Sequence, residues 1–459
     1  MSKAQHSATS AKGTAGAAGP SLGDLLKAAR RRTGMTQGQL ADLSSVSIRT
    51  IRDLELDLTL NPRRETLRLL LDGLRLTGTR RAELEQAATG ARTQVELADQ
   101  LTPPPAALGP IIGREREVEA LARQIASGGR RLIRVVGIAG VGKSRLIQEV
   151  AHRTYAAGLM PVVWAGTWGS VTGRHRGQVS ERLDALLRGE PELDNLAAAF
   201  GTGDTLLALP GGGLDTRAEA ALRRLVELCP GLRVLHESRE HGRCGADTDY
   251  PVFPLDVTAA DGTGHEPPAA PSLRLLLARA DHLGPAARRD PAMLRSLAEV
   301  CRRLDGIPAA VEAAADWLLL YEPAELLGIA VHQPFRLVTP PSRPATDLRA
   351  ALEAGLDALR PAEADVLCRL AAMRPPWTLA DATARTGLTE DSTATAVHLL
   401  VSRGMVRPVR PAAGGTPRFA VLDLVRRIQD ERCRRGTHRC LPSAAPGAAG
   451  DPLHRLASL

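Results

Sequence analysis

The chain has 459 residues, a length that corresponds to about three domains at ~150 residues each. Hydrophobic residues make up 44% and charged residues 24%, a composition that supports several buried cores and excludes wholesale disorder. No apolar run reaches the ~18 residues that a membrane helix needs, and residues 1–20 lack the apolar segment of a secretory signal. Six scattered cysteines without metal-ligand spacing favour a reducing, cytoplasmic location.

The net charge of +8 is unevenly made up. Of the 59 basic residues only four are lysines, and just one of these, Lys143, lies beyond position 27. Residues 21–92 contain thirteen basic and nine acidic residues, so +4 of the total belongs to this short segment. A modest positive charge of this kind is compatible with a polyanionic partner.

The hydrophobic pattern predicts a helical N-terminal segment, an α/β segment and a helical C-terminal part. Residues 21–88 are dense in helical periodicity, whereas from 111 to about 255 short β-rich runs alternate with helices, as in a parallel sheet. The five runs are 132–136, 161–165, 205–209, 232–235 and 252–255. Gly/Pro-rich breaks at 261–271 and 339–344 separate two further helical segments, and a hairpin is expected near 414–417.

Two short helices with a tight turn between them are predicted inside the N-terminal segment. Thr36 is the expected N-cap of the first helix and Ser47 that of the second. The residues expected to pack between them are Leu40, Ala41, Val46, Ile51 and Leu54. The segment resembles the Cro/repressor-like (XRE-type) helix-turn-helix family, and Thr36-Gln37 with Ile51-x-x-Leu54-Glu55 carries this resemblance.

By this resemblance, the second helix of the motif would lie in the major groove of duplex DNA. Arg49 and Arg52 are the candidates for base or phosphate contact, because arginine matches the acceptor atoms of guanine. Gln37, Ser47 and Thr50 are the candidate phosphate anchors. The alternative is a helical bundle with an ordinary solvated basic face.

Two positions differ from the family pattern. Ser45 stands where the turn glycine is common, and Asp57 replaces the glycine that usually ends the recognition helix. Asp53 and Asp57 are expected to place negative charge near the DNA.

Residues 137–144 match the P-loop pattern G-x-x-x-x-G-K-[ST], between an apolar strand and a helix. Gly137, Gly140 and Gly142 allow backbone N–H groups to surround phosphate oxygens at the helix N-terminus. Lys143 would reach the β- and γ-phosphates, and the Ser144 hydroxyl would bind Mg²⁺ through the nucleotide.

Four shorter pieces accompany this loop in the chain. They are Ile111-Ile-Gly113-Arg114-Glu115, Ser238-Arg239-Glu240, Leu304-Asp-Gly306-Ile307-Pro308 and Leu422-Asp-Leu-Val425-Arg426. With the loop, they resemble the NB-ARC branch of the STAND signal-transduction NTPases as found in bacterial transcriptional regulators, over residues 111–435. The resemblance implies that Gly113 and Arg114 flank the adenine, that Arg239 senses the γ-phosphate, and that Pro308 packs on the base. It also implies that residues 345–430 form a winged-helix domain that closes over the nucleotide.

A P-loop ATPase uses a carboxylate at the end of its third strand to support Mg²⁺. Here that position is Pro210, followed by three glycines, and Asp204, Asp215 and Glu237 are all expected to lie away from it. This pattern favours a nucleotide-binding domain with weak or no ATP hydrolysis, at most a slow ATPase, and weak dependence on Mg²⁺. The alternative is that Asp215 supplies the acid from a rearranged loop.

The expected architecture is multidomain α and α/β. Its parts are a disordered tail (1–20), a helix-turn-helix domain (21–88), a linker (89–110), a P-loop NTPase domain (111–260), a helical domain (261–338), a winged-helix-like domain (339–439) and a flexible tail (440–459). We expect a cytoplasmic, sequence-specific transcriptional regulator that binds an operator in double-stranded DNA, associates with itself and is controlled by ATP or ADP with Mg²⁺, without membrane contact. The alternative is a STAND-type signalling or defence ATPase whose helix-turn-helix binds protein.

Overall fold

The computed structural model describes most of the chain outside the tails. The described residues are 21–59, 62–85, 87–88, 104–105, 109–165, 178–211, 214–238, 248–258, 270–280, 283, 290–339, 347–409 and 415–435. Both predicted tails, most of the predicted linker, and Arg239 lie outside these residues. Within the described part, no helix is both long and apolar enough to cross a membrane.

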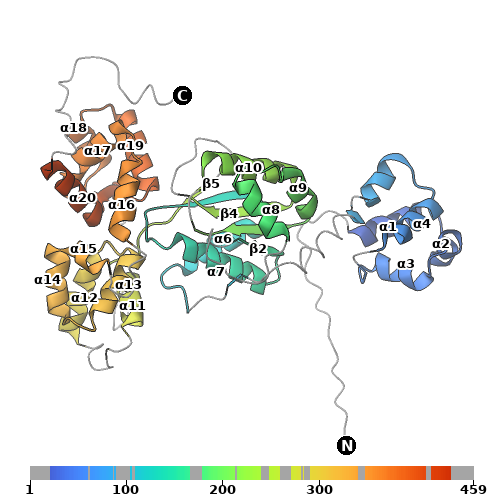
Figure 1. Ribbon diagram of the computed structural model, residues 1–459, viewed down its shortest axis with the longest axis horizontal. Coiled ribbons are helices and arrows are strands. Elements are labelled where there is room, and N and C mark those ends of the chain that lie inside the picture. The colour runs from blue at the N-terminus through green and yellow to red at the C-terminus, as the bar shows by residue number, and fades with distance from the viewer. Residues whose placement is uncertain are drawn as a thin grey trace, which may run out of the picture.

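The N-terminal segment contains the two predicted helices and their predicted caps (Figure 1). Its helices include α1 (Leu22–Arg32), α2 (Gln37–Ser44), α3 (Ile48–Glu55) and α4 (Arg64–Gly73), and residues 78–85 are also helical. Thr36 caps α2 in a capping box with Gln39, and Ser47 caps α3 through the Thr50 amide. Ser45 adopts the left-handed conformation (φ +56°) that the turn requires. Leu40, Ile51 and Leu54 are fully buried between the helices.

The α/β segment is a five-stranded parallel sheet in the order β2-β3-β4-β1-β5. The strands are β1 (Leu132–Val136), β2 (Val162–Trp164), β3 (Thr205–Leu209), β4 (Leu232–Glu237) and β5 (Thr248–Pro251). The helices are α6 (Glu115–Ala126), α7 (Lys143–Ala156), α8 (Gln178–Leu187), α9 (Leu193–Phe200) and α10 (Thr216–Leu228), and they cover both faces of the sheet (Figure 1). Alternate strand residues face opposite sides: Leu206 packs in the core with α6 and α7, and Leu207 packs with α8 to α10.

The fifth strand lies earlier in the chain than the apolar run predicts. The run 252–255 directly follows β5, which is made of the more polar residues Thr248-Asp249-Tyr250-Pro251. The edge position of β5 tolerates this composition, and Asp249 forms an ion pair with the buried Arg134 of β1. Val252 and Leu255 are buried because this stretch leads from the sheet towards the next helices, where the Leu255 amide donates to the Gly306 carbonyl.

The remaining elements form two mainly helical blocks (Figure 1). The middle block contains α11 (Pro271–Arg279), α12 (Pro291–Arg303), α13 (Pro308–Trp317), α14 (Pro323–His332) and α15 (Pro334–Leu337). The C-terminal block contains α16 (Leu348–Asp357), α17 (Pro361–Ala371), α18 (Leu379–Thr386), α19 (Glu390–Ser402), the antiparallel hairpin of β6 (Val406–Val409) and β7 (Arg418–Val421), and α20 (Asp423–Arg434). One continuous hydrophobic core runs from α6, α7 and the sheet through both blocks to Ile428 of α20.

Candidate functional site

The exposed face of α3 presents the residues expected to contact DNA. The Arg49 side chain is 92% exposed and lies 3.8 Å from the Asp53 carboxylate, and Arg52 is exposed one turn further on. Ser47 and Thr50 share a hydroxyl–hydroxyl contact of 2.8 Å at the start of the helix. The structure therefore brings four of the five candidate residues together on α3 and its N-cap, with both arginines exposed to solvent.

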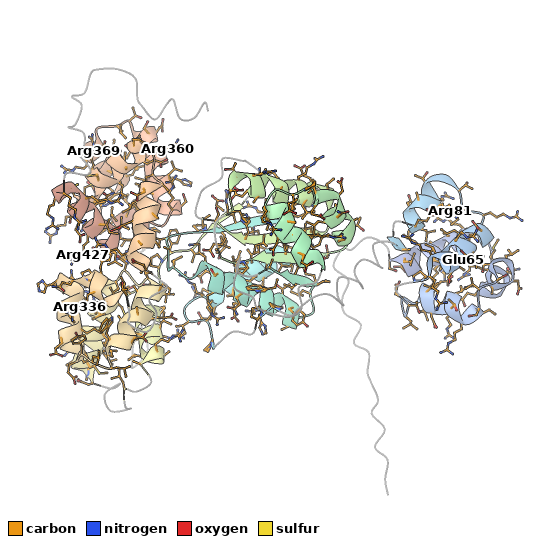
Figure 2. All side chains as sticks on the ribbon, in the orientation of Figure 1. Glu65, Arg81, Arg336, Arg360, Arg369 and Arg427 are labelled. Carbon is orange, nitrogen blue, oxygen red and sulfur yellow. The ribbon has the colours of Figure 1, made fainter. Side chains whose placement is uncertain are left out.

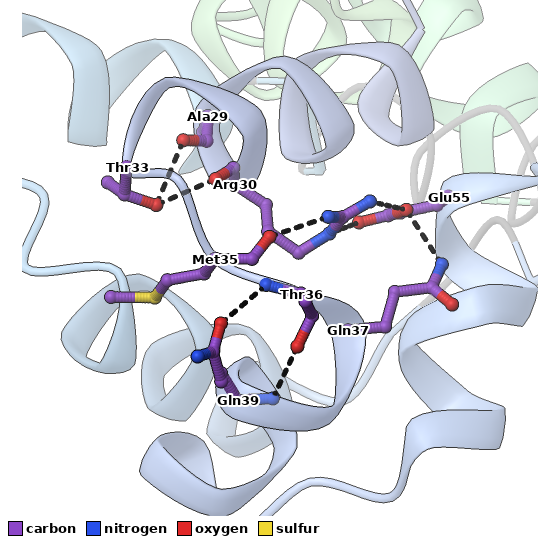
Figure 3. A network of polar contacts seen from close by, with 8 residues as sticks. All are labelled: Ala29, Arg30, Thr33, Met35, Thr36, Gln37, Gln39 and Glu55. Atoms are coloured by element: carbon purple, nitrogen blue, oxygen red, sulfur yellow. Dashed lines mark hydrogen bonds and ion pairs between the residues drawn. The ribbon is translucent and has the colours of Figure 1, made fainter.

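Gln37, the fifth candidate, is held in a polar network inside the segment (Figure 3). Its side-chain amide donates to Glu55 at 2.9 Å, and Glu55 also accepts two hydrogen bonds from the Arg30 guanidinium, at 2.6 and 2.8 Å. Arg30 in turn donates to the Met35 carbonyl at 2.8 Å. Burial alone would raise the pKa of Glu55, but the hydrogen bonds from Arg30 and Gln37 outweigh it and lower that pKa. The network therefore fixes α1, α2 and α3 relative to one another.

Asp57 does not place its charge on the face of α3. Its carboxylate accepts from the Ser21 hydroxyl at 2.7 Å and from the Gly23 amide at 3.1 Å, so the charge is held at the N-terminus of α1. The backbone of Asp57 adopts φ +54°, which explains how it replaces a glycine at this position. The Asp57 carboxylate thus has two donors at the start of α1, and its expected place near the DNA stays a prediction.

The P-loop lies between β1 and α7, at the carboxyl end of the parallel sheet, as predicted. Gly137, Gly140 and Gly142 all have positive φ, at 147°, 76° and 97°, which a residue with a side chain would rarely adopt. Gly142 is the N-cap of α7, and no side chain caps this helix. The loop thus has the backbone form that surrounds an anion at a helix N-terminus.

The ammonium and hydroxyl groups of the loop lie at its base. Lys143 is 6% exposed, and its Nζ donates to the carbonyls of Gly137 and Ile138 at 3.0 and 3.1 Å. The Ser144 hydroxyl donates to Glu237 Oε2 at 2.5 Å, and Lys143 Nζ lies 3.5 Å from Glu237 Oε1. A carboxylate therefore lies beside the loop, and the prediction that Glu237 lies elsewhere is wrong. The error arose because β4 extends to Glu237, two residues beyond the predicted strand.

The other two acids considered from the sequence have structural roles. Asp204 forms an ion pair with Arg233 at 3.1 Å. Asp215 is the N-cap of α10 and accepts from the Ala218 amide at 2.7 Å. Neither contact supports the alternative in which Asp215 supplies the acid, and Pro210 directly follows β3 as predicted.

Of the residues expected around the base, Arg114 and Pro308 lie against the P-loop, and Gly113 lies against α11. Arg114 is buried and donates to the carbonyls of Val141, at 3.2 Å, and Phe253. A Cβ added to Gly142 would lie 3.9 Å from Pro308 Cγ, and one added to Gly113 would meet Pro271 of α11 at 2.6 Å. The loop, the segment before α6 and the middle block therefore meet at one place.

Both helical blocks contact the P-loop itself. The Ala309 amide at the start of α13 donates to the Gly140 carbonyl at 3.1 Å. A Cβ added to Gly404, which precedes β6, would lie 2.7 Å from the Ile138 amide nitrogen, so the C-terminal block approaches the loop backbone closely. The loop backbone therefore lies in direct contact with both blocks.

A buried carboxylate joins the two blocks to each other. Asp305, in a left-handed turn before α13, accepts from the amides of Asp423 and Leu424 at 2.9 Å each, and so caps α20 from another block. Burial raises the pKa of Asp305 to about 7, and the nearby Asp423 also raises it. Arg427, labelled in Figure 2, adds a second link by donating to the Val331 carbonyl at 2.6 Å.

Comparison with known proteins supports the N-terminal assignment. Residues 21–84 match the family described as "Helix-turn-helix domain". The chain is 26% identical over 318 residues to proteins of Mycobacterium bovis and Mycobacterium tuberculosis that are each named "Putative HTH-type transcriptional regulator", an alignment covering 66% of this chain and 34% of theirs. It is also 30% identical over 240 residues to an uncharacterized protein of Mycobacterium bovis, covering 50% of this chain and 55% of the relative.

The chain therefore carries a helix-turn-helix domain and is related to proteins named as regulators of transcription. It spans about a third of the length of those proteins. The similarity to these proteins therefore extends only to the 318 aligned residues.

Proposed function

We propose that the protein is a sequence-specific transcriptional regulator whose helix-turn-helix binds an operator in duplex DNA. The observation that carries this proposal is α3, which follows a family-matched turn and presents Arg49 and Arg52 to solvent. Arginine at the start of such a helix can donate two hydrogen bonds to guanine. The names of the mycobacterial relatives point in the same direction.

DNA binding is tested by measuring which genomic fragments the purified full-length protein retains at physiological salt. Arg49→Ala should relax the sequence preference at one operator position by about 1–3 kcal/mol, because a base contact is lost. Lys27→Ala is the matched control: it should weaken all sequences alike and reduce the salt dependence, as expected for a phosphate contact. A wild-type protein that prefers no sequence over random DNA at any salt would instead favour a signalling protein whose helix-turn-helix binds protein.

We further propose that the α/β segment and both helical blocks act as an NB-ARC-type switch controlled by ATP or ADP. Three features support this: the positive-φ glycines of the loop, the buried Lys143, and the contacts of Ala309 and Gly404 with the loop backbone. A nucleotide held by the loop, Gly113, Arg114 and Pro308 would stabilise one arrangement of the blocks. Its exchange or loss would change that arrangement, the self-association of the protein and so the pairing of its DNA-binding domains.

Mg²⁺ prefers oxygen ligands such as those of Ser144 and Glu237, which lie together beside the loop, so the residues present fit a magnesium–nucleotide complex. The metal would neutralise phosphate charge there. We expect slow hydrolysis, because Pro210 offers no carboxylate at the end of β3 to orient an attacking water.

Nucleotide binding is tested by the thermal stability of the full-length protein with ATP or ADP. Ligand at a hundredfold excess over its Kd should stabilise the wild type by about 2.7 kcal/mol. Lys143→Ala should remove most of that gain, because the β-phosphate loses an ammonium partner, whereas Lys27→Ala should retain it. An equal gain in Lys143→Ala would place the ligand at another site.

A further inference from the structure

Pro210 and Glu237 occupy equivalent positions on neighbouring strands. Strands β3 and β4 run parallel, and their last paired residues are Leu209 and His236. The next residue on each strand is therefore Pro210 on β3 and Glu237 on β4. Side chains of paired residues on adjacent strands point to the same face of a sheet. Glu237 therefore lies beside Pro210, the position at which other P-loop proteins have their third-strand acid.

Strand β4 also lies closer to the P-loop than β3 does. In the sheet order, β4 separates β3 from β1, and Glu237 pairs with Val135, two residues before the loop begins. The Glu237 side chain is 11% exposed, and its carboxylate contacts three groups: the Ser144 hydroxyl at 2.5 Å, the Lys143 ammonium at 3.5 Å and the Gly211 amide at 3.0 Å. The Gly211 contact fixes the carboxylate against the segment that follows β3.

We propose that Glu237 supplies from β4 the carboxylate that a P-loop nucleotide-binding protein takes from the end of its third strand, and that with Ser144 it holds the Mg²⁺ of a bound adenine nucleotide. The inference rests on the proposed nucleotide binding. The sequence led us to expect a weak dependence on Mg²⁺. A carboxylate that helps Ser144 to hold the metal would instead make nucleotide affinity strongly dependent on Mg²⁺.

The same contacts are compatible with a second role, which makes an opposite prediction. A carboxylate beside Lys143 and Ser144 could act as an internal anion that competes with phosphate. Removing its charge would then tighten nucleotide binding whether or not Mg²⁺ is present. If Glu237 instead supports Mg²⁺, removing its charge should reduce the increase in nucleotide affinity that Mg²⁺ gives.

The test is isothermal titration of full-length protein with ATP, in Mg²⁺ and in EDTA. In Glu237→Gln, the ratio of ATP affinity in Mg²⁺ to that in EDTA should fall 10- to 100-fold, as is usual when a group that supports a metal is removed. Its affinity in EDTA should stay at the wild-type value, which also reports that the variant is folded. Binding of Mn²⁺ to the protein–ATP complex, followed by electron paramagnetic resonance, should weaken by the same factor.

Two further variants sharpen the result. Asp215→Asn makes the same charge change at the cap of α10 and should keep the wild-type Mg²⁺ dependence. Adding Pro210→Asp to Glu237→Gln returns an acid to the equivalent position and should restore at least part of the Mg²⁺-dependent gain. Restoration would distinguish support of the metal from a general effect on folding.

Each outcome has a distinct meaning. Wild-type Mg²⁺ dependence in Glu237→Gln, or tighter binding of ATP in both Mg²⁺ and EDTA, would overturn the inference while leaving nucleotide binding intact. A wild-type protein that binds no nucleotide in either condition would overturn the proposed switch and the inference with it.

Discussion

The ion pair between Arg30 and Glu55 holds the helix-turn-helix together at the scale of single residues. Its side chains are 12% and 2% exposed, and two parallel hydrogen bonds join them. A buried pair of this geometry stabilises little relative to apolar residues, but the loss of one partner leaves the other charge buried without compensation. The consequence for stability therefore depends on which residue is changed.

Glu55→Leu should destabilise the helix-turn-helix by about 3 kcal/mol, since Arg30 loses its carboxylate and Gln37 its acceptor. Residues 21–88 contain no tryptophan, so hydrogen–deuterium exchange of amides in α1 to α3 is the suitable measurement. The double variant Arg30→Met, Glu55→Leu is the control and should lose less than the sum of the single variants. Strictly additive losses would contradict coupling between the two side chains.

Single residues also show which roles could be predicted from the sequence. Thr36 and Ser47 act on amides three residues away, so local spacing was sufficient to identify them. Glu237 and Ser144 are 93 residues apart, and Asp57 and Ser21 are 36 apart. Contacts of this kind depend on strand register and helix packing, which no local pattern in one sequence specifies.

At the scale of elements, α20 depends on a carboxylate from another block. Helix α20 has no side-chain cap of its own, and Asp305 accepts from its first two amides. Burial has the largest influence on the pKa of this carboxylate and raises it, as does Asp423, whereas Arg407 and the two backbone amides lower it. A carboxyl whose pKa rises on folding makes the folded state bind more protons than the unfolded state between the two pKa values.

Stability should therefore fall as pH rises from about 4 to about 7, by up to about 4 kcal/mol from Asp305 alone, since its pKa rises from 3.8 to about 7 on folding. Asp305→Asn should flatten this dependence, and asparagine tolerates the left-handed backbone at this position. Thermal unfolding followed by fluorescence of Trp317 and Trp377, in the two blocks, measures it. Parallel pH profiles for the two proteins would show that Asp305 does not titrate in this range.

Element types and order could be predicted better than element ends. Strands β1 and β3 have the predicted bounds, because their apolar residues are buried on both faces of the sheet. The fifth strand was predicted at the apolar run 252–255, but that run is buried by the helical blocks rather than within the sheet. Burial alone could not distinguish these two environments.

At the scale of the whole molecule, the hydrophobic cores divide the chain differently from its functional segments. The helix-turn-helix has a core of its own, formed by residues between Leu22 and Ala88. The core that contains α6 and α7 continues without interruption through the middle block to Ile428. The segment that carries the P-loop therefore shares its interior with both blocks, although it has the α/β fold expected from the sequence.

This shared core determines which fragments of the protein can fold on their own. A fragment that ends with β5 would retain the P-loop but would uncover Ile138, which is buried in the core that the later helices complete. It would also lose the contacts of Ala309 and Gly404 with the loop. We therefore expect the P-loop segment and the two helical blocks to unfold together, and the helix-turn-helix, which has a separate core, to fold on its own.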